Sequence, residues 1–383
     1  MAVYKIFSYK DTTLYSLYPN MNTGIDAILQ ISNLNIGLDS FPVVSRFLIQ
    51  FPQDEVADII TNKISGAQWD VSLRSFIATA EGIVEETEVE VYPVAQEWFN
   101  GTGMYLDSPQ TQDGAAWLSP YFAGGIDWDN STTTPQDPYG NLVTSSYNPN
   151  YISGGGGAWL YASESVSFKA TQSFDVRSAK DINIPVKEVV SRWYSGSMDN
   201  NGFIVKWEDA IEWNTSVQVQ PVMQFYSIDT NTIYPPQLEF KWQDYSTVLT
   251  GSATGSIVDT TNLVSSLAEN PGYFTPQSVN RFRLNVAPKY PVKIYTTESQ
   301  FTGTNYLPTS SCYAVKDLDT NEFVIDYDDT FTQLSSDDHG NYFDIYMNGL
   351  EPERYYKICV KTHIKGSTLI LDDNYYFKVV NAL

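Results

Sequence analysis

The chain has 383 residues and a mass of 43.1 kDa, enough for two or three domains, and its 42% hydrophobic and 17% charged residues are typical of a folded protein. It carries 22 Lys and Arg against 45 Asp and Glu, and this net charge of −23 disfavours general binding to nucleic acid or to anionic membranes. Only 2 His and 2 Cys are present. Because this is too few for a zinc cluster or an iron–sulfur site, we expect no metal and no cofactor.

The aromatic content gives further information on the structural class of the protein. Phe, Trp and Tyr make up 14% of the residues, with 27 Tyr and 9 Trp. Tyr and Trp favour pleated, half-buried surfaces and interfaces, where one end of the ring packs and the other stays in water. The composition therefore indicates β structure and contacts with a partner, more than a small-molecule enzyme.

The first residues, MAVYKIFSYKDTTLYS, lack the basic end, apolar run and cleavage site of a signal peptide. No stretch approaches the roughly 18 apolar residues of a membrane helix. We therefore expect a protein assembled in a cytoplasm and not in a membrane, unless the sequence is a mature form without its leader. Cys312 and Cys359 could form a disulfide, but each shares a strand face with a lysine, which favours two free, partly exposed thiols.

Helical patterns are few. Apolar residues at helical spacing predict short helices in QDEVADIITNKI (53–64) and VKEVVSRWY (186–194), and TNLVSSLAEN (261–270) offers a third with fewer apolar positions. Elsewhere, short alternating runs are broken by Gly, Pro, Asn and Asp, which is the pattern of an all-β protein.

Alternation of apolar and polar residues is clearest toward the C-terminus. Short strands are predicted in RFRLNV (281–286), VKIYTT (292–297), SCYAVKDL (311–318), EFVIDY (322–327), YFDIYM (342–347), YYKICVKTHI (355–364) and NYYFKVV (374–380). In EFVIDY, for example, we expect Phe323 and Ile325 to share the inward face. Strands of this number and spacing predict a sandwich of the immunoglobulin type.

One motif supports this architecture. The segment LEPERYYKICV resembles the tyrosine corner of fibronectin type III domains, with Leu350, Pro352 and Tyr356 at the matching positions. The resemblance implies that the Tyr356 hydroxyl binds back to the loop that enters its strand. It implies a fold and carries no information on activity.

We expect a β-rich domain over residues 1–247, a linker over 248–280 and the smaller sandwich over 281–383. Within the first domain, a segment of about 100–157 is dense in Gly, Pro, Asn, Ser and Thr and ends in GGGG (154–157). A loop of this length is either a functional insertion or partly mobile. No Lys or Arg occurs between Arg74 and Lys169, which predicts an acidic or neutral face.

The order of the N-terminal motifs resembles the DNRLRE-type jelly-roll domain, also classed as carbohydrate-binding module family 96-like. The matching segments are DTTLYSLYPNMNTG (11–24), SRFLIQF (45–51), VVSRWYSGSMDNNGFIVK (189–206) and PPQLEFKW (235–242). The resemblance implies a jelly-roll β-sandwich used for surface attachment or virion architecture and, in some secreted members, for polysaccharide binding. Gln50 stands where the family has a second arginine, and no sugar-binding residue carries over.

A jelly roll without an export signal, followed by an immunoglobulin-like domain, resembles structural proteins of tailed bacteriophages. The resemblance implies a non-enzymatic component of the tail, neck, collar or fibre region that is assembled in the host cytoplasm. Its partners would be other virion proteins and further copies of itself, with no nucleic acid. A carbohydrate-binding module or adhesin for host surface polysaccharide is the alternative, with Trp128 or Trp207 stacking on sugar rings; a glycoside hydrolase or lyase comes third.

The aromatic residues of the insertion are the candidate interface. They are Trp117, Tyr121, Trp128, Tyr139, Tyr147, Tyr151 and Trp159. Desolvated Trp and Tyr side chains dominate binding hot spots, so these residues could anchor neighbouring subunits. Equally, they could pack together as a small core of their own that stabilises a long loop, and the sequence does not decide between these two roles.

The sequence gives little support for a catalytic site or a metal site. His339 lies in a turn-like DDHG and His363 on the lysine face of a strand, and no nucleophile elbow surrounds a serine. The acids of WEDAIEW (207–213) resemble a glycosidase pair, but a solvated acidic turn explains them more simply. Alternating acids that could bind calcium, at 127–130, 317–319 and 326–328, are better explained as turn-forming residues.

Overall fold

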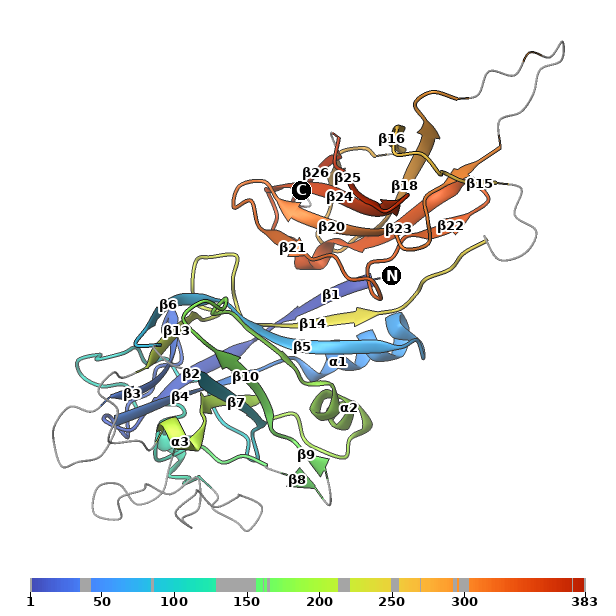
Figure 1. The fold of residues 1–383 in the computed structure, drawn as a ribbon. Coiled ribbons are helices and arrows are strands. Elements are labelled where there is room, and N and C mark those ends of the chain that lie inside the picture. The colour runs from blue at the N-terminus through green and yellow to red at the C-terminus, as the bar shows by residue number, and fades with distance from the viewer. Residues whose placement is uncertain are drawn as a thin grey trace. The chain divides into compact units, whose positions relative to one another are not determined.

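The computed structural model describes residues 2–34, 43–83, 86–128, 156–160, 162–163, 166–212, 221–248, 255–268, 270–291, 295, 303–373 and 375–381. The chain divides into two compact units. The N-terminal unit comprises Ile6–Lys63 and Val71–Glu239, and the C-terminal unit comprises Met1–Lys5, Ile64–Asp70 and Phe240–Leu383. Both units consist mainly of strands, so the prediction of an all-β protein is confirmed (Figure 1).

The two better helical patterns form helices, and the third does not. Helix α1 covers Gln53–Asp58 and continues as a π-helical turn, Ile59–Ile64, while α2 covers Lys187–Ser195. Residues Leu263–Ala268, expected to be helical, form strand β16 instead. Leu263 and Leu267 also obey a period of two, and pairing with β18 (Val279–Pro288) turns both toward the core, which outweighs the local helical spacing.

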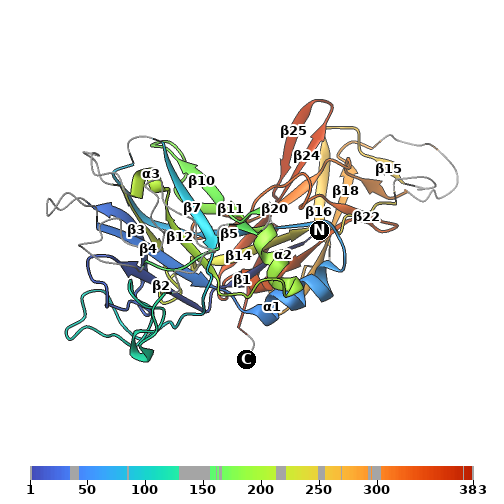
Figure 2. The same cartoon turned by 90° about the horizontal axis from the view of Figure 1, so that it is seen from below.

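The largest sheet of the N-terminal unit has eight strands. Its order is β10-β7-β12-β4-β3-β13-β6, and β2 pairs with β4. Figure 2 labels β10, β7, β12, β4, β3 and β2 among these strands. The strands are β2 (Lys10–Tyr15), β3 (Ile28–Leu34), β4 (Val43–Gln50), β6 (Ile77–Glu81), β7 (Thr87–Pro93), β10 (Ala170–Phe174), β12 (Phe203–Trp207) and β13 (Val222–Tyr226). Every residue of β4 and β12 is buried, so the centre of this sheet is covered on both faces.

A second sheet has the order β1-β14-β5-β11. Its strands are β1 (Ala2–Phe7), β14 (Gln237–Trp242), β5 (Trp69–Ser75) and β11 (Ile182–Pro185). The short α3 (Asp209–Glu212) follows β12 directly. The small strands β8 (Ala162–Ser163) and β9 (Val166–Ser167) pair with each other.

The C-terminal unit is a β-sandwich. One sheet has the order β16-β18-β23-β22, and the other has the order β17-β26-β24-β20-β21, with β25 paired to β24. The remaining strands are β15 (Ser256–Ile257), β17 (Tyr273–Phe274), β19 (Asn305–Tyr306), β20 (Cys312–Asp317), β21 (Phe323–Ile325), β22 (Ser335–Asp337), β23 (Gly340–Tyr346), β24 (Tyr355–Ile364), β25 (Ser367–Leu371) and β26 (Tyr376–Val379). The stretch expected to be a linker, residues 248–280, contains β15, β16 and β17 among its described residues, and the main segment of the C-terminal unit begins at Phe240, earlier than expected.

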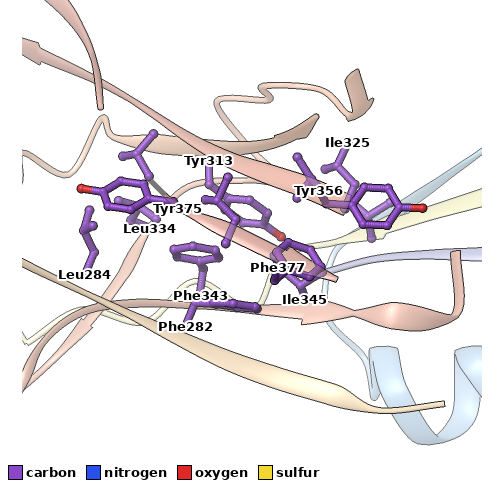
Figure 3. Packing of buried hydrophobic residues seen from close by; sticks show 14 of the residues in the cluster. Phe282, Leu284, Tyr313, Ile325, Leu334, Phe343, Ile345, Tyr356, Tyr375 and Phe377 are labelled. Atoms are coloured by element: carbon purple, nitrogen blue, oxygen red, sulfur yellow. The ribbon is translucent and has the colours of Figure 1, made fainter. Parts of the chain in front are cut away.

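Aromatic rings fill the space between these two sheets (Figure 3). The rings of Tyr313 and Phe343 stack with their centroids 4.4 Å apart, and Phe282 lies 5.7 Å from Phe343 and nearly parallel to it. The hydroxyl group of Tyr356 points away from the cluster and donates a hydrogen bond to the Glu351 carbonyl at 2.9 Å. This is the tie that the resemblance to fibronectin type III domains implied.

Two details of the sandwich differ from the expected alternation. Phe323 is 43% exposed whereas Ile325 is buried, because Val324 is an extra residue opposite the Val315–Lys316 step and the register shifts there. Cys312 and Cys359 are free, as expected, but both are buried. The loop between β21 and β22 covers their side of the sheet, since Gln333 bridges to Cys312 and Asp329 lies 3.8 Å from its sulfur.

Candidate functional site

Three of the predicted interface residues lie inside the N-terminal unit. Trp117, Trp128 and Trp159 are at most 4% exposed and belong to one hydrophobic cluster with Trp98 and Tyr92. They are therefore core residues of this unit and not exposed anchors, because their rings already pack against the chain's own sheet. Tyr139, Tyr147 and Tyr151 lie outside the described residues.

Tyr121 is the predicted residue that remains near the surface. It is partly exposed, and its ring packs against Phe99 at a centroid distance of 4.2 Å. Phe99 is itself 44% exposed. This pair forms an aromatic edge of the insertion that solvent or a partner can reach.

A buried ion pair lies beside the tryptophan cluster. Arg46, in the middle of β4, donates two hydrogen bonds to the carboxylate of Glu212 at 2.7 and 2.8 Å, and the two side chains are 1% and 0% exposed. A third hydrogen bond from Arg46 reaches the Gly156 carbonyl at 2.7 Å. The guanidinium group also lies 5.0 Å from the ring of Trp117 and 5.2 Å from that of Trp159. Arg46 thus joins α3, residue 156 and two indoles to the sheet.

The Gly156 backbone makes this approach possible. Its φ is +80°, in the left-handed region, and a Cβ atom there would lie 2.5 Å from an Arg46 nitrogen. A glycine is therefore required both by the backbone conformation and by the space. The contact with Arg46 therefore explains why Gly156, the third residue of the GGGG segment, is a glycine.

Lys206 extends the network along β12. Its ammonium group is 2.7 Å from a carboxylate oxygen of Asp209, 3.2 Å from Glu90 and 3.5 Å from Glu212. Burial alone lowers the pKa of Lys206, but the three carboxylates more than offset this and hold the pKa above its usual value. Lys169 adds a further contact to Glu90 at 2.5 Å.

This network fixes structure and is poorly suited to acid–base catalysis. In this network the buried carboxylates of Glu90 and Glu212 each contact a cation, so neither is held as a free general acid or nucleophile. The expectation that WEDAIEW forms a solvated acidic turn is wrong for Glu212, which is fully buried. The missed signal is that Arg46 and Lys206 interrupt otherwise apolar strand patterns, where an interior charge needs a partner.

Asn22 holds the beginning of the insertion. Its amide group donates to the carbonyls of Asn100 and Ala115 at 2.7 and 2.9 Å, and its oxygen accepts from the backbone N–H of Gly103 at 2.9 Å. The contact is close, since a Cβ atom on Gly24 would lie 1.9 Å from the Asn100 carbonyl oxygen. Residues of the PNMNTG turn thus clamp residues 100–115 in place.

Around this clamp the unit exposes apolar side chains. They are Ile25, Phe99, Met104, Tyr105, Leu106 and Ile126, which are 39–52% exposed. Solvent-exposed apolar side chains that gather on an ordered segment are typical of interaction sites. The candidate functional site is therefore the outer surface of the insertion, and not the aromatic residues that its inner side buries.

A separate recess of about 490 Å³ lies beside α2 in the same unit. Its lining includes Phe168, Arg192, Met198, Asp199 and Asn201. Arg192 pairs with Glu188 at 2.8 Å, and its guanidinium group lies 4.9 Å from the Phe168 ring. Polar groups around a small apolar floor could hold a polar ligand.

The other residues considered for chemistry lie in turns or on strands. His339 is 80% exposed, and the Asp317 and Asp328 carboxylates accept backbone N–H groups of their own turns. Across the described ranges, no three His, Cys, Asp or Glu side chains gather as a group that could hold a metal ion. None of the helices in those ranges combines the length and apolar character needed to cross a membrane.

Comparisons with known proteins add little. No protein-family model matches the chain, and no curated protein matches it at a significant level. The chain is weakly similar to a crystal structure of a DUF4785 family protein from Legionella pneumophila, with 8% sequence identity and a TM-score of 0.17. The match covers 99% of this chain and 62% of that one. A likeness this weak carries no argument about fold or function.

Proposed function

We propose that this protein is a non-enzymatic structural component of a bacteriophage virion, in the tail, neck, collar or fibre region. It acts through contacts with other virion proteins and with further copies of itself, after assembly in the host cytoplasm. The motif resemblances to a DNRLRE-type jelly roll and to an immunoglobulin-like domain support this proposal.

One observation carries the proposal. The insertion is clamped by Asn22 on its inner side and exposes apolar side chains on its outer side. A surface that is ordered before binding loses little conformational entropy when a partner binds. Such a surface suits permanent contacts between proteins, whereas the buried Glu90 and Glu212 carboxylates are held by the cations of Arg46 and Lys206.

The test is to look for the chain in purified particles of the phage that encodes it. Mass spectrometry of these particles should detect the chain in a fixed ratio to the major structural proteins. Light scattering after size-exclusion chromatography should show self-association or co-assembly of the isolated protein. Absence of the chain from the purified particles would overturn the proposal.

Binding of a surface polysaccharide is the second candidate, and the recess beside α2 favours it. Trp128 and Trp207 are buried and cannot serve as stacking platforms, so the recess with Arg192 and Asn201 is the better place for a sugar. On a glycan array, saturable binding that Arg192→Ala abolishes and Arg177→Ala retains would support this function. Arg177 is the matched control because it is an exposed arginine of the same unit outside the recess.

A further inference from the structure

Four exposed apolar residues, one just after the PNMNTG turn and three in the insertion, lie on two adjacent segments, and we name them the tip patch. It consists of Ile25, Met104, Tyr105 and Leu106, which are 39%, 45%, 45% and 52% exposed. The backbone N–H of Ile25 donates to the Gly103 carbonyl at 3.1 Å, so the two segments of the patch are adjacent. Large apolar side chains are thus placed together where water covers about half of each.

Hydrogen bonds close the turn that carries three residues of the tip patch. Leu106 has a φ of +59°, in a region that a leucine avoids unless its surroundings impose it. The turn is closed by hydrogen bonds from the N–H of Met104 to the Asp107 carboxylate at 2.8 Å and from the N–H of Asp107 to the Met104 carbonyl at 3.2 Å. In this turn the Leu106 side chain is 52% exposed.

Tyrosine packing fixes the second anchor. The ring of Tyr105 lies 4.9 Å from that of Tyr15 and 6.1 Å from that of Tyr18. Its backbone N–H also donates to the Asp26 carboxylate. Tyr105 therefore offers a ring whose orientation is already set, which is the property of an interface anchor.

The surroundings of the tip patch are acidic. Asp26 and Asp107 lie at its edge, and burial raises the pKa of Asp26 while the nearby Asp107 raises it further. No Lys or Arg occurs in the sequence between Arg74 and Lys169, so the insertion supplies no compensating cation. A second copy of a chain with 45 acidic and only 22 basic residues is a poor electrostatic match for this surface.

We propose that the tip patch inserts into an apolar recess, rimmed by lysine and arginine side chains, on a different protein of the same particle. The proposal rests on the proposed function and names the chemistry of its partner. Tyr105 and Leu106 enter the recess, and the basic rim pairs with Asp26 and Asp107.

Photo-crosslinking in assembled particles tests the partner directly. The photoreactive amino acid p-benzoylphenylalanine is placed at Tyr105, and cross-linked peptides are identified by mass spectrometry. We expect a single partner peptide that contains apolar residues flanked by Lys or Arg, from a virion protein other than this chain. A cross-link to a second copy of this chain, or to an acidic surface, would overturn the proposal.

A matched pair of variants keeps the test independent of folding. Leu106→Asn retains the size of the side chain and tolerates positive φ, but it removes the apolar character. We expect its incorporation into particles, in competition with wild type, to fall about tenfold, as for a hot-spot residue. Val176→Asn, at an exposed residue of another turn in the same unit, should be incorporated as wild type.

The two proposals fail in different ways. If wild-type protein is absent from purified particles, the proposed function fails. If wild type is present but Leu106→Asn is incorporated equally well and the probe at Tyr105 forms no cross-link, the tip patch is not the contact while the proposed function stands.

Discussion

An ion pair of the C-terminal unit and one of the N-terminal unit differ in how deeply they are buried. In the C-terminal unit, stacked rings such as Tyr313 and Phe343 fill the core, and ion pairs such as Arg281–Asp344 lie on the strand surface. In the N-terminal unit, the Arg46–Glu212 pair lies beneath the insertion with both side chains almost fully buried. The difference follows from what each unit must cover: two regular sheets bury each other, whereas an irregular insertion has backbone carbonyls that need buried donors.

The comparison also shows what the buried charges contribute. Replacing a buried ion pair by apolar residues is often neutral, so such a pair is weak support for high stability. Its geometry is nevertheless specific, because three nitrogen atoms of Arg46 each donate to an acceptor on α3 or on residue 156. We interpret the network as the feature that gives the insertion a single position on the sheet.

The largest effect is expected when the buried pair is broken on one side. Arg46→Met leaves the Glu212 carboxylate buried with Lys206 as its remaining cation, and it leaves the Gly156 carbonyl without this donor. We expect a loss of about 3–5 kcal/mol in the free energy of unfolding of the N-terminal unit, measured by urea denaturation. Surface ion pairs contribute less than about 1 kcal/mol to stability. A loss this small would show that the buried pair contributes no more than the surface pair of the other unit.

The next effect concerns pH. Burial raises the pKa of Asp11 to about 8, and the backbone N–H of Ile228 offsets this only in part, while Asp229 and Asp26 raise it further. Because the folded state then holds the proton more tightly than the unfolded chain, whose aspartate pKa is near 3.8, stability should fall as the pH rises from the unfolded pKa to about 8.

Asp11→Asn removes this titration and can still accept the hydrogen bond from Ile228. Relative to wild type, the variant should gain unfolding free energy steadily as the pH rises from about 4 to about 8, with no further gain above. Urea denaturation at a series of pH values measures this. Parallel curves for the two proteins would show that Asp11 does not titrate in this range.

A smaller effect is expected at the tyrosine corner. Tyr356→Phe keeps the ring in the core and removes one hydrogen bond to the Glu351 carbonyl. The C-terminal unit should lose about 1 kcal/mol in unfolding free energy, because a carbonyl acceptor is left without its donor. Tyr375→Phe, which removes a bond to Ser265, is the matched control for loss of a tyrosine hydroxyl elsewhere in the same core.

The smallest effect is expected at the surface pair. Arg281 and Asp344 make two hydrogen bonds of 2.8 Å, but their side chains are 48% and 22% exposed. Arg281→Met should change the unfolding free energy by no more than about 1 kcal/mol, and the change should shrink in high salt. A loss as large as that of Arg46→Met would show that burial does not set the value of these pairs.

Much of the fold could be predicted from local patterns. The alternation of apolar and polar residues predicted the strands around Phe282, Phe343 and Tyr356, because every second residue of a strand in a sandwich faces the core. It failed at Phe323, where an extra residue in the strand shifts the register, and at Leu263–Ala268, where spacing fits helix and strand alike. Neither feature is visible without the neighbouring strand.

The candidate site was harder to predict. Composition identified the insertion, but it could not separate the inward indoles of Trp117 and Trp159 from the outward residues Tyr105 and Leu106. The partners of Arg46 come from α3 and residue 156, more than 100 positions away in the sequence. Contacts of this separation depend on the tertiary fold, so no local pattern indicates them.

Hydrogen–deuterium exchange over residues 99–126 tests the central claim, that the insertion is an ordered contact surface. In the free protein, the amides of Gly103 and Ala115, bound to Asn22 and Phe99, should already be protected. In assembled particles, the amides of Met104–Asp107 should gain further protection. Rapid exchange of the whole segment in the free protein, or unchanged exchange at the tip patch after assembly, would contradict the account.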